Sequence, residues 1–178
     1  MQDALVVAMY LNCFIRNAQI VKMANLAQLV NVIAPMMVTN DKLWMQTTYY
    51  PLQLFSQNCY GQSVESYVDC DTYNAGNYKN VPYLDVSSIY DDSAKELIIN
   101  VVNRHLDKAI ETSIQNQFGK LANKATVYEV NATDINDENT VNSEKVKTTE
   151  KQIDVNGDFI NYIFPAHSFT MLKIKLTK

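Results

Sequence analysis

The stretch KVKTTEKQIDVNGDFINYIF, residues 145–164, contains two strand-like runs separated by Asn156-Gly157. Asn-Gly between runs of β-branched and aromatic residues is the strongest short-range signal of a β-hairpin closed by a type I′ turn. The stretch therefore predicts strands over 145–155 and 158–164. It also indicates that the C-terminal part of the chain is built from β-structure.

The same pattern extends outward through residues 62–178. Turn clusters such as Asn74-Ala75-Gly76-Asn77 separate further short runs rich in β-branched and aromatic residues. The additional predicted strands cover 63–73, 82–90, 95–105, 109–117, 125–131 and 168–177. Eight closely spaced strands without a helical pattern between them are typical of an antiparallel sandwich or jelly roll. We therefore expect a mainly β fold, with residues 62–178 as an antiparallel β-sandwich of jelly-roll type.

Residues 1–61 follow a different pattern. From Ala4 to Ile15 the apolar residues repeat every four positions in nearly every direction, which predicts a helix covered on most sides, with Asp3 as its N-cap. Ile20–Ala27 is apolar enough to predict a short buried strand. A helix followed by a buried strand is typical of a parallel sheet or barrel.

The remainder of this part is predicted to be a loop over 28–43 and a second helix over Leu43–Cys59, which Pro51 kinks or breaks. Gly61 closes this part. The change of pattern predicts two domains, 1–61 and 62–178.

The charges are spread unevenly between these two parts. The chain has 178 residues, 47% of them hydrophobic, and a formal net charge of −4. This composition excludes a disordered chain, and the lack of a basic run argues against a nucleic-acid partner. The first sixty residues contain only Asp3, Arg16, Lys22, Asp41 and Lys42 as charged residues. A free-standing segment normally exposes charge, so we expect residues 1–61 to be covered by further protein, as the tail of something larger.

Cys13, Cys59 and Cys70 are too few and too irregularly spaced for a disulfide framework. They are expected to be buried thiols in a reducing compartment. The apolar run Ala4–Ile15 is too short to span a bilayer and lacks the flanks of a signal peptide. We expect a cytoplasmic protein without a membrane contact.

No motif for a metal or cofactor is present. His105, His167 and the cysteines do not have the spacing of metal ligands, and no glycine-rich phosphate loop occurs. Residues 1–61 contain no Glu, and only Asp3 and Asp41 as acids. Glycoside hydrolysis requires two carboxyl groups facing one bond, which this part cannot supply. The sequence therefore predicts no metal site, no cofactor and no catalytic carboxylate pair in residues 1–61.

Three amides, Asn25, Gln28 and Asn31, interrupt the apolar run from Val21 to Ala34. A buried amide is costly unless it is hydrogen-bonded. At the end of a strand, an amide can point into a pocket and bind sugar hydroxyls through its donor and its acceptor. From the residues alone, both a structural role and a sugar-binding role remain open for these side chains. The same alternative holds for Trp44 and the tyrosines, as packing residues or as a stacking surface.

Several longer stretches closely resemble the C-terminal region of α-L-arabinofuranosidases of glycoside hydrolase family 51. The matching segments are VKMANLAQLVNVIAP (21–35), QTTYYP (46–51), VPYLD (81–85), VNRHLD (102–107), ATVYEVN (125–131) and FPAHS (164–168). They span nearly the whole chain in the family's order. One departure is Arg16-Asn17, where the family usually has Arg-His.

The resemblance implies a fold in two parts. Family members join a (β/α)₈ barrel to a C-terminal β-sandwich, and residues 1–61 resemble an αβα remnant of the barrel. Asp3–Ala18 then corresponds to the helix after the nucleophile strand, Ile20–Ala27 to the eighth strand and Leu43–Gln57 to the closing helix. The family sandwich also takes one strand from the N-terminus of the full protein.

The resemblance also implies the chemistry. Family members are exo-acting retaining hydrolases with two catalytic glutamates on barrel strands that precede the matched stretch, and many are homo-oligomers. Gln28 corresponds to the glutamine that hydrogen-bonds arabinose, whereas Asn25 and Asn31 receive no role. The expected substrates are arabinan, arabinoxylan or arabino-oligosaccharides, and this chain alone is expected to be inactive. The alternative is a non-catalytic carbohydrate-binding or assembly module.

Overall fold

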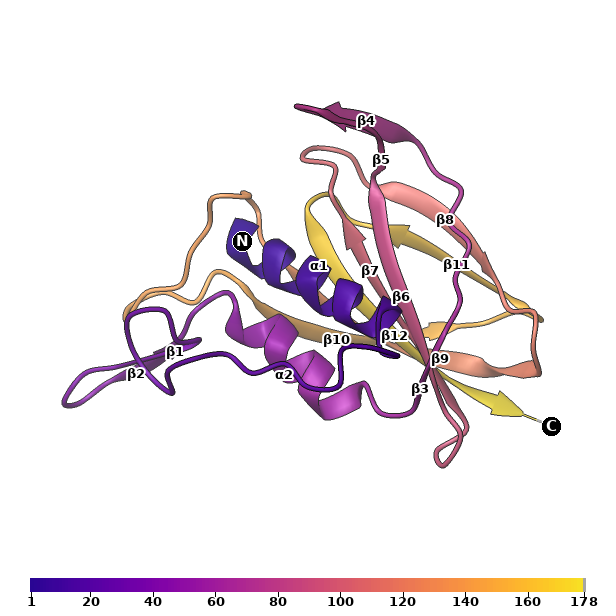
Figure 1. Cartoon of the computed structure of the whole chain (residues 1–178), viewed down its shortest axis with the longest axis horizontal. Coiled ribbons are helices and arrows are strands. Elements are labelled where there is room, and N and C mark those ends of the chain that lie inside the picture. The colour runs from indigo at the N-terminus through magenta and orange to yellow at the C-terminus, as the bar shows by residue number, and fades with distance from the viewer. Residues whose placement is uncertain (178) are drawn as a thin grey trace.

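The computed structural model describes residues 1–177. Within this range the chain forms two helices and twelve strands, so the fold is mainly β with antiparallel sheets, as predicted (Figure 1). The helices are α1 (Gln2–Arg16) and α2 (Tyr49–Asn58). The strands are β1 (Met36–Val38), β2 (Leu43–Met45), β3 (Gln62–Val64), β4 (Thr72–Ala75), β5 (Tyr78–Pro82), β6 (Leu84–Asp91), β7 (Glu96–Asn103), β8 (Ile110–Gln115), β9 (Lys120–Asn131), β10 (Lys147–Asp154), β11 (Phe159–Phe164) and β12 (Ser168–Thr177).

A six-stranded antiparallel sheet is the centre of the fold. Its strand order is β10-β9-β12-β7-β6-β3, and β12 pairs with β9 on one side and β7 on the other. β7 and β12 are buried along most of their length. Both faces of these strands are covered, which explains why their sequences, ELIINVVN and SFTMLKIKLT, are apolar on successive residues instead of alternating.

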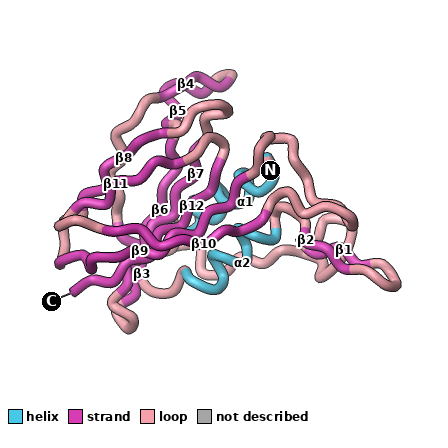
Figure 2. Tube along the Cα trace, turned by 180° about the vertical axis from the view of Figure 1, so that it is seen from behind, coloured by secondary structure: helices cyan, strands magenta, loops and turns pink. Residues whose placement is uncertain are grey.

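The central sheet has a different cover on each face. Phe169 and Met171 of β12 face α1 and α2, whereas Leu172 and Ile174 face the opposite way, toward β11. The two-stranded sheet of β8 and β11 covers this second face. Figure 2 shows the helices on one side of the sheet and β8 with β11 on the other. The predicted sandwich is therefore formed, with helices packed against its outer face.

A turn does form here, with Gly157 and Asp158 at its centre instead of Asn156-Gly157, but the hairpin predicted around it is wrong. β10 pairs with β9, and β11 pairs with β8, so the two strands flanking the turn belong to different sheets. Only the isolated bridge between Asn156 and Phe159 links them. Gly157 has φ +69° and its neighbours are not left-handed, whereas a type I′ turn requires positive φ at both central residues. The turn carries the chain from one layer of the sandwich to the other.

The strand predicted over Ile20–Ala27 is also wrong, because these residues form turns and irregular backbone. A barrel strand needs a neighbour on each side to satisfy its backbone N–H and C=O groups. None of the described strands lies beside this segment. Its side chains are correspondingly exposed, with Ile20 at 74% and Met23 at 79%.

The predicted loop 28–43 and second helix are corrected in part. The antiparallel pair β1–β2 occupies residues within and just after that loop, and α2 begins only at Tyr49. Pro51 is the third residue of α2. A proline in the first turn removes no intrahelical hydrogen bond, so Pro51 neither kinks nor breaks the helix.

Two further predictions concern the ends of elements. The N-cap of α1 is Met1, not Asp3, which lies in the first turn where its charge still complements the helix dipole. The predicted strand 63–73 forms only at its ends, as β3 and the start of β4. The turn after it is confirmed, because Gly76 (φ +58°) lies between β4 and β5. This hairpin projects from the body of the molecule (Figure 1).

A buried polar network joins α1 to the central sheet. Asp85 of β6 is 6% exposed, and its carboxylate accepts from Arg16 Nη2 at 3.0 Å and from Arg104 Nη2 at 2.9 Å. Asn12, which is fully buried in α1, donates to the second Asp85 oxygen at 3.1 Å. Ser87 completes the network by donating to Asn12 Oδ1 at 2.7 Å. These contacts attach the helix to the sheet through specific partners as well as through apolar packing.

Candidate functional site

Gln28, the predicted sugar-binding residue, lies in an exposed loop. Residues 28–35 connect the irregular segment after α1 to β1, and Gln28 is exposed. Its Oε1 accepts a hydrogen bond from the Ile33 backbone N–H at 3.4 Å. The amide nitrogen donates to none of the described residues, so it is free to donate to a ligand hydroxyl. The structure does not place Gln28 at a strand end, as the sequence predicted, because that strand is absent.

The backbone of this loop is strained. Gln28 (φ +65°), Asn31 (φ +64°) and Val32 (φ +54°) are all left-handed. Asparagine adopts this conformation readily, but for a β-branched valine it is an outlier. Strained backbone of this kind persists only where the surroundings enforce it, and it is concentrated at ligand-binding sites. The strain marks residues 28–32 as a candidate site independently of their resemblance to known enzymes.

The surroundings of the loop are apolar and exposed. Leu29 and Val32 are each 77% exposed, and Ile33 is 62% exposed. Asn25 is exposed and is not brought into contact with Gln28 by any hydrogen bond in the described chain. Asn31, in contrast, is hydrogen-bonded to β1. Asn25 and Asn31 are the same residue type, so only their backbone conformation and partners in the structure distinguish them.

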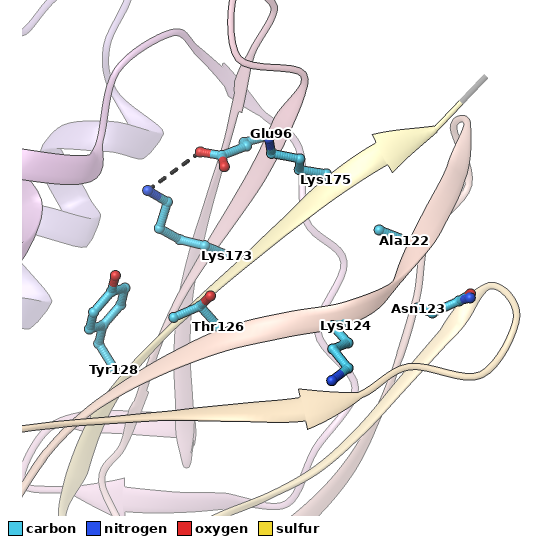
Figure 3. A pocket seen from close by; sticks show the side chains of 8 residues that line it. All are labelled: Glu96, Ala122, Asn123, Lys124, Thr126, Tyr128, Lys173 and Lys175. Carbon is cyan, nitrogen blue, oxygen red and sulfur yellow. Dashed lines mark ion pairs between the residues drawn. The ribbon is translucent and has the colours of Figure 1, made fainter.

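A groove on the helix side of the central sheet is the second candidate site. It has a volume of about 490 Å³ and lies across β7, β9 and β12 (Figure 3). Its central residue is Lys173, which contacts Glu96 Oε2 at 3.4 Å and Asn58 Oδ1 at 3.0 Å. Its other two lysines, Lys124 and Lys175, lie opposite Asp154 and Glu96 in the strand register. The groove lining therefore carries three lysines and one carboxylate, Glu96, which is already paired with Lys173.

The titratable side chains elsewhere serve the fold. Burial raises the pKa of the Cys59 thiol to about 12, which makes this cysteine unreactive. Burial and the hydrogen bond to Glu144 raise the pKa of Tyr50. Tyr162 is affected in the same way by burial and by its hydrogen bond to Glu129. All three cysteines are free, but the predicted burial is wrong for Cys13, which is exposed, whereas Cys59 and Cys70 are half-buried.

Both histidines form hydrogen bonds with the backbone of loops. His105 Nδ1 accepts from the backbone N–H of Asp107 and of Lys108, and the ring of His167 lies between two carbonyl oxygens, those of Leu106 and Ala132. Within residues 1–177, His, Cys, Asp and Glu side chains are nowhere gathered in threes as metal ligands. Neither described helix has the length and apolarity needed to cross a membrane.

Comparison with known proteins identifies this architecture. A model of the family "Alpha-L-arabinofuranosidase C-terminal domain" matches residues 1–168. The probable alpha-L-arabinofuranosidase C of Aspergillus terreus is 36% identical over 98% of this chain, which covers 34% of that relative. The intracellular exo-alpha-(1->5)-L-arabinofuranosidase of Halalkalibacterium halodurans is 36% identical over 61% of this chain and 22% of its own length.

Comparison with solved structures indicates the same family. The arabinose complex of the Thermotoga maritima alpha-L-arabinofuranosidase superimposes with a TM-score of 0.88 at 27% identity, over 98% of this chain and 38% of that one. The GH51 enzyme of Thermotoga petrophila gives 0.86 at 27% identity, over 97% and 38%. The fold is thus that of the C-terminal β-domain of family 51 glycoside hydrolases.

The chain belongs to the α-L-arabinofuranosidase C-terminal domain family. It spans about a third of the length of the Aspergillus relatives that it matches.

Proposed function

We propose that these residues are the C-terminal part of a retaining, exo-acting enzyme that releases terminal α-L-arabinofuranosyl residues. The proposed substrates are arabinan, arabinoxylan or arabino-oligosaccharides. The observation that carries the proposal is the match of the family model over residues 1–168. It is supported by the relative from Halalkalibacterium halodurans, whose name specifies exo-action on α-(1->5) linkages.

We place the two catalytic carboxyl groups of the full enzyme outside these residues. A retaining mechanism needs two carboxyl groups about 5–5.5 Å apart, one as nucleophile and one as acid and base. In residues 1–61 the only acids are Asp3, in the first turn of α1, and Asp41, whose carboxylate accepts from Thr39. We therefore assign the two catalytic glutamates to barrel strands of the full enzyme, residues 1–61 to the end of that barrel, and 62–178 to the sandwich.

Gln28 is proposed to bind the arabinose. Its Oε1 is turned toward the Ile33 N–H, which leaves the two N–H groups of the amide to donate to sugar hydroxyl oxygens. A neutral amide supplies no proton at neutral pH and no negative charge, so it contributes binding and orientation, not acid–base chemistry. We propose that arabinose-containing saccharides are the ligands, that the full enzyme is a homo-oligomer and that it is cytoplasmic. The free cysteines and the relative named intracellular support this compartment.

The proposal predicts that the 178-residue chain alone releases no aryl group from an aryl α-L-arabinofuranoside, because it contributes neither catalytic glutamate. The measurement is continuous absorbance of the released phenol with the purified chain. A longer protein that includes these residues at its C-terminus serves as the positive control. Release by the chain alone, above a buffer blank and proportional to its concentration, would contradict the proposed placement of the catalytic carboxyl groups.

A second prediction concerns Gln28 in the longer protein. Gln28→Ala should lower kcat/KM by about 10-fold, since a neutral hydrogen bond contributes roughly 0.5–1.5 kcal/mol and about 1.4 kcal/mol corresponds to tenfold. Gln117→Ala, at an exposed glutamine of the loop after β8, is the matched control and should leave kcat/KM unchanged. Wild-type kinetics in Gln28→Ala would remove Gln28 from the site.

A further inference from the structure

We propose that Asn31 is a positioning residue that holds the loop presenting Gln28. The inference rests on the proposed sugar-binding role of Gln28 and goes beyond it, because it assigns to a second residue the geometry on which that role depends. Asn31 itself need not touch the sugar. Its effect is exerted through the backbone of residues 28–35.

Asn31 forms three hydrogen bonds that hold the loop, two to β1 and one within the loop. The Asn31 backbone N–H donates to the Met36 carbonyl oxygen at 2.8 Å. Its side-chain Oδ1 accepts from the Val38 N–H at 2.7 Å. Its carbonyl oxygen accepts from the Ala34 N–H at 2.9 Å. One residue thus connects the loop to the start and the end of β1 and also closes the turn that follows.

Gln46, just after β2, holds the other end of the loop. Its Nε2 donates to the Ala34 carbonyl oxygen and its backbone N–H donates to the Pro35 carbonyl oxygen, both at 2.8 Å. Ala34 is fully buried. The loop is thus attached to β1 and to the residue that follows β2, and the contact between Gln28 Oε1 and the Ile33 N–H closes it internally.

The loop depends on these hydrogen bonds because its apolar side chains do not hold it. Leu29, Val32 and Ile33 all point outward and are more than half exposed. Left-handed backbone at Gln28 and Val32 is unfavourable, so the loop needs attachments to stay in this shape. Removing the Asn31 side chain should therefore displace Gln28 without removing any buried apolar contact of the core.

The test uses the longer protein with three substitutions at this position. Asn31→Asp keeps the acceptor oxygen, Asn31→Gly keeps the freedom to adopt left-handed φ but loses the acceptor, and Asn31→Ala loses both. We expect kcat/KM and the affinity for free arabinose to fall about 10-fold in Asn31→Ala, less in Asn31→Gly, and no more than about 2-fold in Asn31→Asp. Thermal midpoints measured alongside should stay close to wild type.

A double variant separates positioning from general damage. If Asn31 acts through Gln28, then Asn31→Ala introduced into Gln28→Ala should weaken arabinose binding by less than about 2-fold further. Additive losses, or an Asn31→Ala variant with wild-type arabinose affinity, would overturn the inference while leaving the role of Gln28 intact. Wild-type affinity in Gln28→Ala would instead overturn the proposed sugar contact, and the inference with it.

Discussion

Replacing Asp85 by alanine should lower the free energy of unfolding of this chain by about 3–5 kcal/mol, the typical cost of breaking a buried ion pair by removing one partner. The Asp85 carboxylate is 6% exposed and is the shared partner of Arg16 and Arg104. Arg104 is itself only 18% exposed. Without Asp85, its charge would remain in a largely desolvated site without a compensating carboxylate.

The loss should extend beyond the two ion pairs. Asn12 is fully buried and donates to both the carboxylate and the backbone carbonyl oxygen of Asp85. Truncation of Asp85 removes the carboxylate acceptor and leaves the Asn12 amide with only the backbone carbonyl oxygen. A buried donor without a partner is costly. Urea denaturation followed by far-UV circular dichroism at neutral pH measures the change.

Two control variants distinguish the buried charge from charge in general. Asp85→Asn keeps the size and one acceptor oxygen, so its destabilisation should be smaller than that of Asp85→Ala but still clear. Asp92→Ala removes an exposed carboxylate that is paired with Lys95, and it should leave the unfolding transition unchanged. Equal effects of Asp85→Ala and Asp92→Ala would show that the buried network does not stabilise the fold.

The residues of this network also belong to the part of the fold that can be predicted from sequence. Asp85 and Arg104 come from the segments VPYLD and VNRHLD, whose order and spacing indicate the family. The β-branched and aromatic content of β6 to β12 located these strands, although β9 begins at Lys120, five residues before the predicted strand 125–131. Local signals were sufficient wherever burial against the central sheet decided the structure.

Local signals failed where partners decide the structure. Ile20–Ala27 has the composition of a buried strand, but a strand requires neighbours, and none of the described strands lies beside it. Asn156-Gly157 has the sequence of a hairpin, yet the flanking strands find better partners in β9 and β8. At the candidate site, the resemblance indicates Gln28 directly. The proposed role of Asn31 depends on its hydrogen bonds to β1, and the sequence predicts the β1–β2 pair as loop and helix.

Phe169 joins the central sheet to α2. This side chain of β12 is fully buried and stacks on Phe55 of α2, with ring centroids 5.4 Å apart. Phe169→Ala should lower the free energy of unfolding by about 3–5 kcal/mol, through lost burial and the cavity that remains. Phe55, at 7% exposed, lies on the N-terminal side of Gly61 and Phe169 on the other. Their contact therefore tests whether the two parts of the chain are stabilised together.

A double-mutant cycle provides that test. Phe55→Ala and Phe169→Ala should be coupled by about 0.5–1.5 kcal/mol, because each variant removes the partner of the same aromatic pair. Phe164→Ala is the matched control: Phe164 is 1% exposed but lies in the core on the other face of the sheet, so it should be as destabilising and show no coupling to Phe55. Coupling for Phe169 alone, within a single transition, would mean that α2 is part of the sandwich's stable unit. In that case the exposed loop around Gln28 is attached to a rigid support, as a residue that orients a sugar requires.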